Sequence, residues 1–97
     1  MRKAIVINQD DNVAVALTDI KAGEKVLIRI GNSEVEITAH SAIPFGHKFA
    51  IRRITKGSKV IKYGEVIGRA TADIEVGEHV HVHNVESLRG RGNLEVR

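Results

Sequence analysis

Short runs of alternating apolar and polar residues recur along this chain of 97 residues, separated by glycine, asparagine and aspartate. Alternation with a period of two is typical of strands with one buried face, and no run keeps the helical period of about 3.6 residues over three turns. The pattern predicts a mostly β, single small domain of short strands. The expected strands cover residues 4–7, 13–17, 48–52, 60–63, 65–67 and 77–84, with a hairpin over residues 27–37.

The hairpin prediction depends on Gly31-Asn32, a favoured two-residue turn between strands. This turn also fixes the register, because it places Ile30 opposite Ser33. The apolar pairs then fall on one face and the charged pair on the other, as a strand with one buried face requires. The remaining predicted pairs are Arg29 with Glu34, Ile28 with Val35 and Val26 with Ile37.

A motif of Ile, Gly and Val at fixed offsets occurs three times, within residues 20–26, 54–60 and 74–80. We call each of these motifs a Gly corner. Glycine at the middle position can adopt a positive φ angle, which a tight turn before a new strand often requires. The spacing between the motifs is irregular, so they predict a recurring turn within one domain and no solenoid.

Three histidines at alternate positions, His79, His81 and His83, are the most unusual feature of the sequence, and we call them the His row. Side chains two apart in a strand share a face, so the intervening Val80 and Val82 are expected to face the core. Imidazole is the commonest protein metal ligand and exchanges protons near neutral pH. The His row therefore predicts a metal site or a general acid/base.

A solvated edge strand would also produce this spacing without any function. Residues two apart lie about 7 Å apart along a strand, so one metal ion is expected to take two of the three imidazoles and other ligands from elsewhere. His40 follows the hairpin in a polar loop and is expected to be a bystander.

A second group of polar residues follows the only proline, Pro44. Pro44 stiffens the chain and Gly46 allows a sharp bend, so His47 and Lys48 are expected at the start of a strand. A fixed His and Lys suit recognition of an anion or carboxylate, or proton transfer, and equally a structural turn with two solvated bases. Asn84 could contact a ligand or cap a turn.

Composition narrows the functional classes further. There is no cysteine, which excludes disulfides, thiolate metal sites and cysteine nucleophiles. The formal charge of +3 favours an anionic small molecule or an acidic protein surface over nucleic acid. The apolar runs are too short for a signal peptide or a membrane span, so a cytoplasmic location is expected. Residues 1–86 are expected to form the domain, and residues 87–97 a basic, glycine-containing tail.

Several of these segments together closely resemble the N-terminal SAF domain of altronate and galactarate dehydratases. The resemblance extends over about residues 5 to 90 and implies the β-clip fold of antifreeze-protein-like modules. The segments that carry it are residues 11–17, 44–50, 60–64, 67–74 and 77–84.

The resemblance also implies a function. The family removes water from sugar acids with a divalent metal, iron(II) or manganese(II), and the related sulfolactate sulfo-lyases eliminate sulfite and carry this domain as a separate small subunit. In the fused enzymes a long catalytic domain follows, so a large catalytic chain is the expected partner and would hold the metal jointly. The family implies His79, His81 and His83 as metal ligands, His47, Lys48 and His83 as catalytic, and His47, Lys48 and Asn84 as substrate-binding.

Three classes of function stay open on the sequence. The chain could be the accessory part of a lyase, a stand-alone module that binds a sugar acid or a metal, or a structural assembly domain. Each is compatible with a homo-oligomer.

Overall fold

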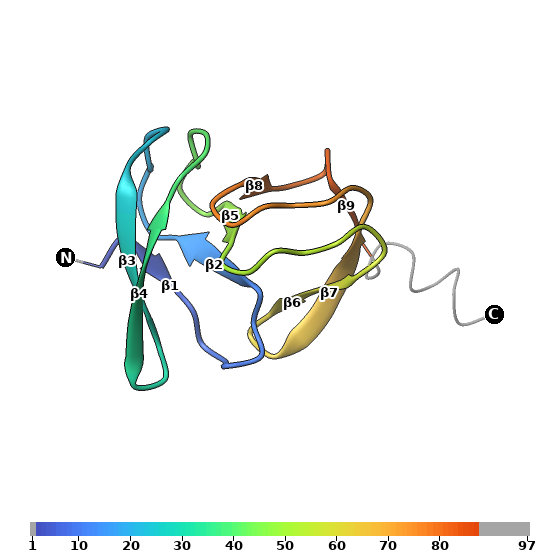
Figure 1. Ribbon diagram of the computed structural model, residues 1–97, viewed down its shortest axis with the longest axis horizontal. Coiled ribbons are helices and arrows are strands. Elements are labelled where there is room, and N and C mark those ends of the chain that lie inside the picture. The colour runs from blue at the N-terminus through green and yellow to red at the C-terminus, as the bar shows by residue number, and fades with distance from the viewer. Residues whose placement is uncertain (1, 88–97) are drawn as a thin grey trace.

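The computed structural model describes residues 2–87, and in this part of the chain every regular element is a strand. This confirms the mostly β prediction. Figure 1 shows the short strands joined by long connecting turns. The strands are β1 (Ala4–Ile5), β2 (Val13–Ala16), β3 (Lys25–Ile30), β4 (Ser33–Thr38), β5 (Lys48–Ala50), β6 (Lys59–Lys62), β7 (Glu65–Ala70), β8 (His79–Val80) and β9 (Val85–Ser87).

The strands form three small antiparallel sheets. The four-stranded sheet has the order β1-β2-β5-β8, so β8 is an edge strand. The hairpin β3-β4 forms its own sheet, and β6, β7 and β9 form the third. In Figure 1 the four-stranded sheet lies between the β3-β4 hairpin and the β6-β7-β9 sheet. Sequence-distant β5 and β8 are thereby neighbours, which matters for the site below.

The predicted hairpin register is confirmed pair by pair, from Ile30 opposite Ser33 to Val26 opposite Ile37. Val26 and Ile28 are each only 1% exposed and contribute to the core. Val35, opposite Ile28, is 41% exposed, so the buried face of the hairpin covers mainly β3 and the base of β4.

Between residues 2 and 87 the structure contains four Gly corners, one more than the sequence pattern predicts. The fourth covers residues 43–49 and has Ile43 and Gly46 at the same offsets, but Phe49 stands where the other three have Val, so the Ile, Gly and Val pattern does not predict it. In all four the glycine has a φ between +84° and +92°. Each glycine N–H donates to the carbonyl of a buried alanine, and that alanine N–H donates back to the residue after the glycine. The four alanines are Ala39, Ala16, Ala70 and Ala50.

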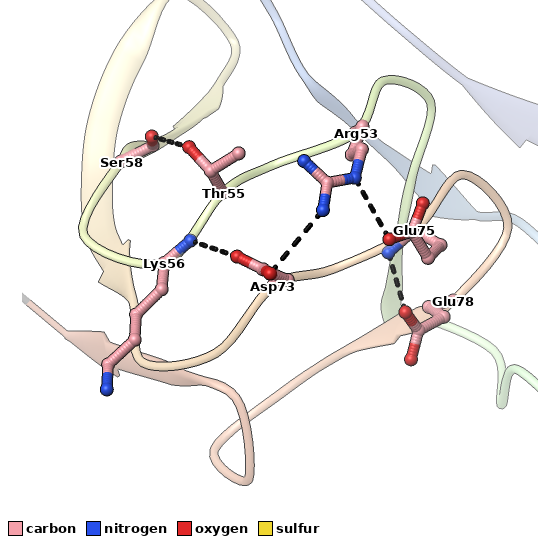
Figure 2. A network of polar contacts seen from close by, with 7 residues as sticks. All are labelled: Arg53, Thr55, Lys56, Ser58, Asp73, Glu75 and Glu78. Carbon is pink, nitrogen blue, oxygen red and sulfur yellow. Dashed lines mark hydrogen bonds and ion pairs between the residues drawn. The ribbon is translucent and has the colours of Figure 1, made fainter.

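The corners associate in two pairs, through bridges between Ile20 and Ile43 and between Ile54 and Ile74. A polar network over the second pair is shown in Figure 2. Asp73 accepts a hydrogen bond from the Lys56 backbone N–H at 2.8 Å, while Arg53 makes ion pairs to Asp73 and Glu75. The ion pairs are exposed and stabilise little, whereas the backbone bond fixes the corner. Asp19 has the corresponding role in the first pair, because it accepts a hydrogen bond from the Phe45 backbone N–H.

Two apolar clusters form the interior. One lies under the hairpin and β1 and includes Ile28, Ile43 and Phe49; the other lies under β6 and β7 and includes Ile54 and Val60. Val80 of β8 is 2% exposed and belongs to the second cluster, as predicted. The edge strand that carries His79 is therefore anchored by the residue next to it.

The prediction of one strand over residues 77–84 is wrong beyond Val80. The strand ends there and a tight turn follows over residues 81–84, so Val82 is 82% exposed instead of buried. The predicted tail, apart from Ser87, lies outside the described residues. Across residues 2–87 no helix is long and apolar enough to span a bilayer.

Candidate metal and anion site

Strand pairing brings the two histidine-bearing segments together. In the β5-β8 pair, Lys48 lies opposite Val80 and Phe49 opposite His79. Continuing this register by one residue places His47 beside His81, because paired positions in antiparallel strands are side by side. The Gly corner before each strand fixes where it begins, so the two glycine turns determine which histidines meet.

His47, His79 and His81 form one compact group, which we call the His cluster. One ligand nitrogen from each lies within 4.8 Å of the others. His47 Nδ1 and His79 Nε2 are 2.8 Å apart, a hydrogen bond in which one of the two nitrogens carries the proton. The rings of His47 and His81 have centroids 4.4 Å apart, and those of His79 and His81 5.3 Å apart.

The turn after β8 is closed by Asn84, which is 5% exposed. Its Oδ1 accepts from the His81 N–H at 2.9 Å, and its Nδ2 donates to the His79 carbonyl at 2.9 Å. The backbone carbonyl of His81 also accepts from the N–H groups of Asn84 and Val85. Asn84 thus caps a turn, the second of the two roles that the sequence left open, and orients His79 and His81 through their backbone.

The electrostatic environment favours the neutral form of His79 and His81. Burial, and then the positive charges that His47 and His81 would carry, lower the pKa of His79 below its usual value near 6.5. Desolvation, and then the charges of His47 and Lys48, lower the pKa of His81 in the same direction. A neutral imidazole keeps a lone pair on its unprotonated nitrogen, which is the form that a metal ion binds.

The His cluster fits a divalent transition metal. Metal–nitrogen bonds of about 2.1 Å place neighbouring ligand nitrogens about 3.0–3.5 Å apart. The observed separations are close enough for small side-chain rotations to reach this geometry. Imidazole suits iron and zinc, whereas manganese prefers oxygen, so the donor set favours iron(II) over manganese(II). Within residues 2–87 the group contains no carboxylate, so further ligands would come from substrate, water or a partner chain.

A pocket of about 310 Å³ adjoins the His cluster, between β5, β8 and the β6-β7-β9 sheet. Lys48 and Lys62 line it together with His81, which belongs to both features. Burial, and then the nearby charge of Lys62, lower the pKa of Lys48. Since neighbouring residues of a strand face opposite ways, His47 points to the cluster and Lys48 to the pocket.

The structure groups the predicted residues differently from the sequence. His47, expected to be catalytic and substrate-binding and not a metal ligand, lies with His79 and His81, while His83, expected to be a ligand, lies outside the group of close nitrogens. The His83 ring remains near, with its centroid 5.5 Å from that of His79. Lys62 was missed, since it lies 14 residues from Lys48 on another strand and no local spacing links the two.

The model of the altronate/galactarate dehydratase SAF domain matches residues 2–88, nearly the whole chain. This chain belongs to that family. Figure 1 therefore shows a SAF domain of this family, in which the pairing of β5 with β8 places the two histidine-bearing segments side by side.

Similar proteins carry this SAF domain in two settings. An altronate dehydratase of Bacillus subtilis is 41% identical over 87 residues, and one of Escherichia coli is 46% identical over 83 residues. The matches cover 90% and 86% of this chain, but only 17% and 16% of the two dehydratases. A (2R)-sulfolactate sulfo-lyase subunit alpha of Chromohalobacter salexigens is 39% identical, with 88% of this chain and 94% of that subunit covered.

Proposed function

We propose that this SAF domain is the non-autonomous part of a metal-dependent lyase that eliminates water or sulfite from a sugar acid or related hydroxy acid. A large catalytic chain or domain would complete its active site. The observation that carries the proposal is the His cluster, three imidazoles from two segments that meet beside a cationic pocket. The relatives support it, because similar domains form a sixth of dehydratases or a subunit of a sulfo-lyase.

In such an elimination a base takes the proton next to the carboxylate, a hydroxide or sulfite leaves the adjacent carbon, and a double bond forms between the two carbons. A divalent metal in the His cluster would supply Lewis acidity to the oxygens of the bound acid. Lys48 would hold a carboxylate at the pocket. His83, exposed next to His79 and outside the cluster, is suited to carry a proton to or from the reacting atoms.

His47, His79 and His81 would be the metal ligands from this chain. The Asn84 amide is bonded to the backbone on both sides, so its contribution is to hold the turn on which His81 lies. In this ligand set His47 replaces His83 of the sequence-based set, because the His47 nitrogen lies within the group of close nitrogens and those of His83 do not.

In the first experiment the purified chain is titrated with Fe(II) under anaerobic conditions, and binding is measured by calorimetry. Co(II) serves as a spectroscopic substitute. One ion per chain is expected. Replacing His47, His79 or His81 by Ala should weaken binding by about tenfold or more, as expected for the loss of one ligand bond. His40→Ala is the matched control, because His40 is exposed and outside the cluster.

The second experiment measures turnover of altronate, galactarate and sulfolactate by the same metal-loaded chain. None is expected without a large chain. Robust turnover by the chain alone would refute its non-autonomous role. Absence of Fe(II) and Co(II) binding, or equal binding by the three cluster variants and His40→Ala, would refute the metal site.

A further inference from the structure

The pocket beside the His cluster has an unbalanced charge. Lys48 and Lys62 both line it, and neither ammonium makes an ion pair with a carboxylate in the described part of the chain. Because both ammonium groups belong to side chains that line the same pocket, their like charges repel each other. Two neighbouring cations that are partly removed from water are stabilised by an anion between them.

The walls of the pocket are apolar. Ile67, Val80 and Val85 line it together with the two lysines and His81. Water competes less well for a cation next to such walls than on an open surface, so ion pairs formed there are stronger. A pocket of about 310 Å³ is at the small end for ligand sites, which fits an acid of a few carbons.

The position of Lys62 is maintained by a strained turn. Tyr63 has a φ of +54°, the only positive value at a non-glycine in residues 2–87, and Gly64 follows with +79°. Two successive positive φ angles form the tight hairpin turn that normally uses Asn-Gly, so tyrosine is a costly residue here. Its ring lies 5.2 Å from the Lys62 ammonium, a cation–π contact that orients the lysine.

We infer that Lys48 and Lys62 form a carboxylate-binding subsite for a small hydroxy acid, with Tyr63 as the residue that positions Lys62. The subsite shares His81 with the His cluster, so an acid whose carboxylate lies between the lysines would present its hydroxyl groups toward the three imidazoles. Identification of that acid as the substrate rests on the proposed function. Binding of the carboxylate rests only on the pocket.

The test uses the full chain freed of metal on a chelating resin, at fixed ionic strength, with L-tartrate as the probe. The neutral polyol threitol is the matched ligand without carboxylates. Amide chemical shifts of Lys48, Val80 and Val85 are expected to change with tartrate in a saturable way and to be unaffected by threitol. Lys48→Gln and Lys62→Gln should each raise the dissociation constant about fivefold or more, which is the loss of one charge-assisted contact.

Lys59→Gln is the control for the lysine variants, because Lys59 is on the same strand as Lys62 and does not line the pocket. It should change the dissociation constant less than about twofold, through long-range charge alone. Tyr63→Asn separates positioning from stability. Asparagine adopts this φ more readily than tyrosine, so the variant should melt no lower than the parent. It lacks the aromatic ring that orients Lys62, so it should bind tartrate about two- to fivefold more weakly.

Unsaturable or equal shifts with tartrate and threitol would overturn the subsite, as would equal losses in Lys59→Gln and Lys62→Gln. Undiminished tartrate binding by Tyr63→Asn would overturn the positioning role. Because the measurement is made without metal, it is independent of the metal titration. If the chain binds tartrate but no metal, the subsite is supported and the proposed function is refuted. If it binds a metal but no tartrate, the subsite is refuted and the proposed function is supported.

Discussion

The Gly corner before β8 offers a sharp test of how the fold positions the His cluster. Gly77 has a φ of +92°, and a Cβ built on it would overlap the backbone carbonyl oxygen of Thr38. Gly57 occupies the same place in another corner with a φ of +89°, but a Cβ there would meet nothing within 4 Å. Replacing each by Ala therefore introduces the same backbone strain, and only Gly77→Ala adds a collision.

The expected costs can be worked out from the contacts. Alanine at a positive φ costs about 1–2 kcal/mol, which is the whole expected loss for Gly57→Ala. In Gly77→Ala the backbone must move away from Thr38, and three bonds hold it where it is. Ala50 accepts from the Gly77 N–H, Gly77 accepts from the His40 N–H, and Glu78 accepts from the Ala50 N–H. At about 1 kcal/mol each, their loss raises the total to about 4–5 kcal/mol.

Thermal unfolding followed by circular dichroism measures the difference. A domain of this size has a stability of about 5–15 kcal/mol, and each 1 kcal/mol lowers the melting temperature by about 4–8 °C. We expect Gly57→Ala to melt about 5–15 °C below the parent, and Gly77→Ala about 16–40 °C below it. Equal losses in the two variants would refute the argument, because they would show that the approach to Thr38 costs nothing.

Two further predictions concern β8 and its turn. Val80→Ala should lose about 1–3 kcal/mol in urea unfolding, because Val80 is 2% exposed and its removal leaves a cavity, whereas Val82→Ala should stay within about 0.5 kcal/mol because Val82 is 82% exposed. Equal losses would mean that the valines have been assigned to the wrong environments. The second prediction concerns pH: in the unfolded chain His79 and His81 take up protons near pH 6.5, whereas their lowered pKa values delay this uptake in the folded chain, so the metal-free melting temperature should fall as the pH drops below about 6.5. His79→Gln should flatten this dependence between pH 7 and 5, and an unchanged slope would contradict it.

Much of the fold was determined by local sequence. The hairpin register followed from Gly31-Asn32, because a two-residue turn leaves only one way to pair the flanking residues. Three Gly corners were found from their Ile, Gly and Val spacing, because the turn geometry demands glycine wherever it occurs. The fourth does not follow from this spacing, because Phe49 replaces the valine although its glycine has the same conformation.

The candidate site depends both on the local sequence and on the tertiary structure. The sequence identified His79 and His81 by their alternation, and His47 and Lys48 by the stiff turn before them. It could not show that His47 joins the other two, because that proximity comes from the pairing of β5 with β8, some 30 residues apart in the chain. It also could not show where the strand ends, because Asn84 closes the turn through bonds to the backbone of His79 and His81. Local alternation specifies which side chains share a face. Long-range backbone pairing and burial of the two apolar clusters decide which faces meet, and they also bring Lys62 to the same pocket as Lys48.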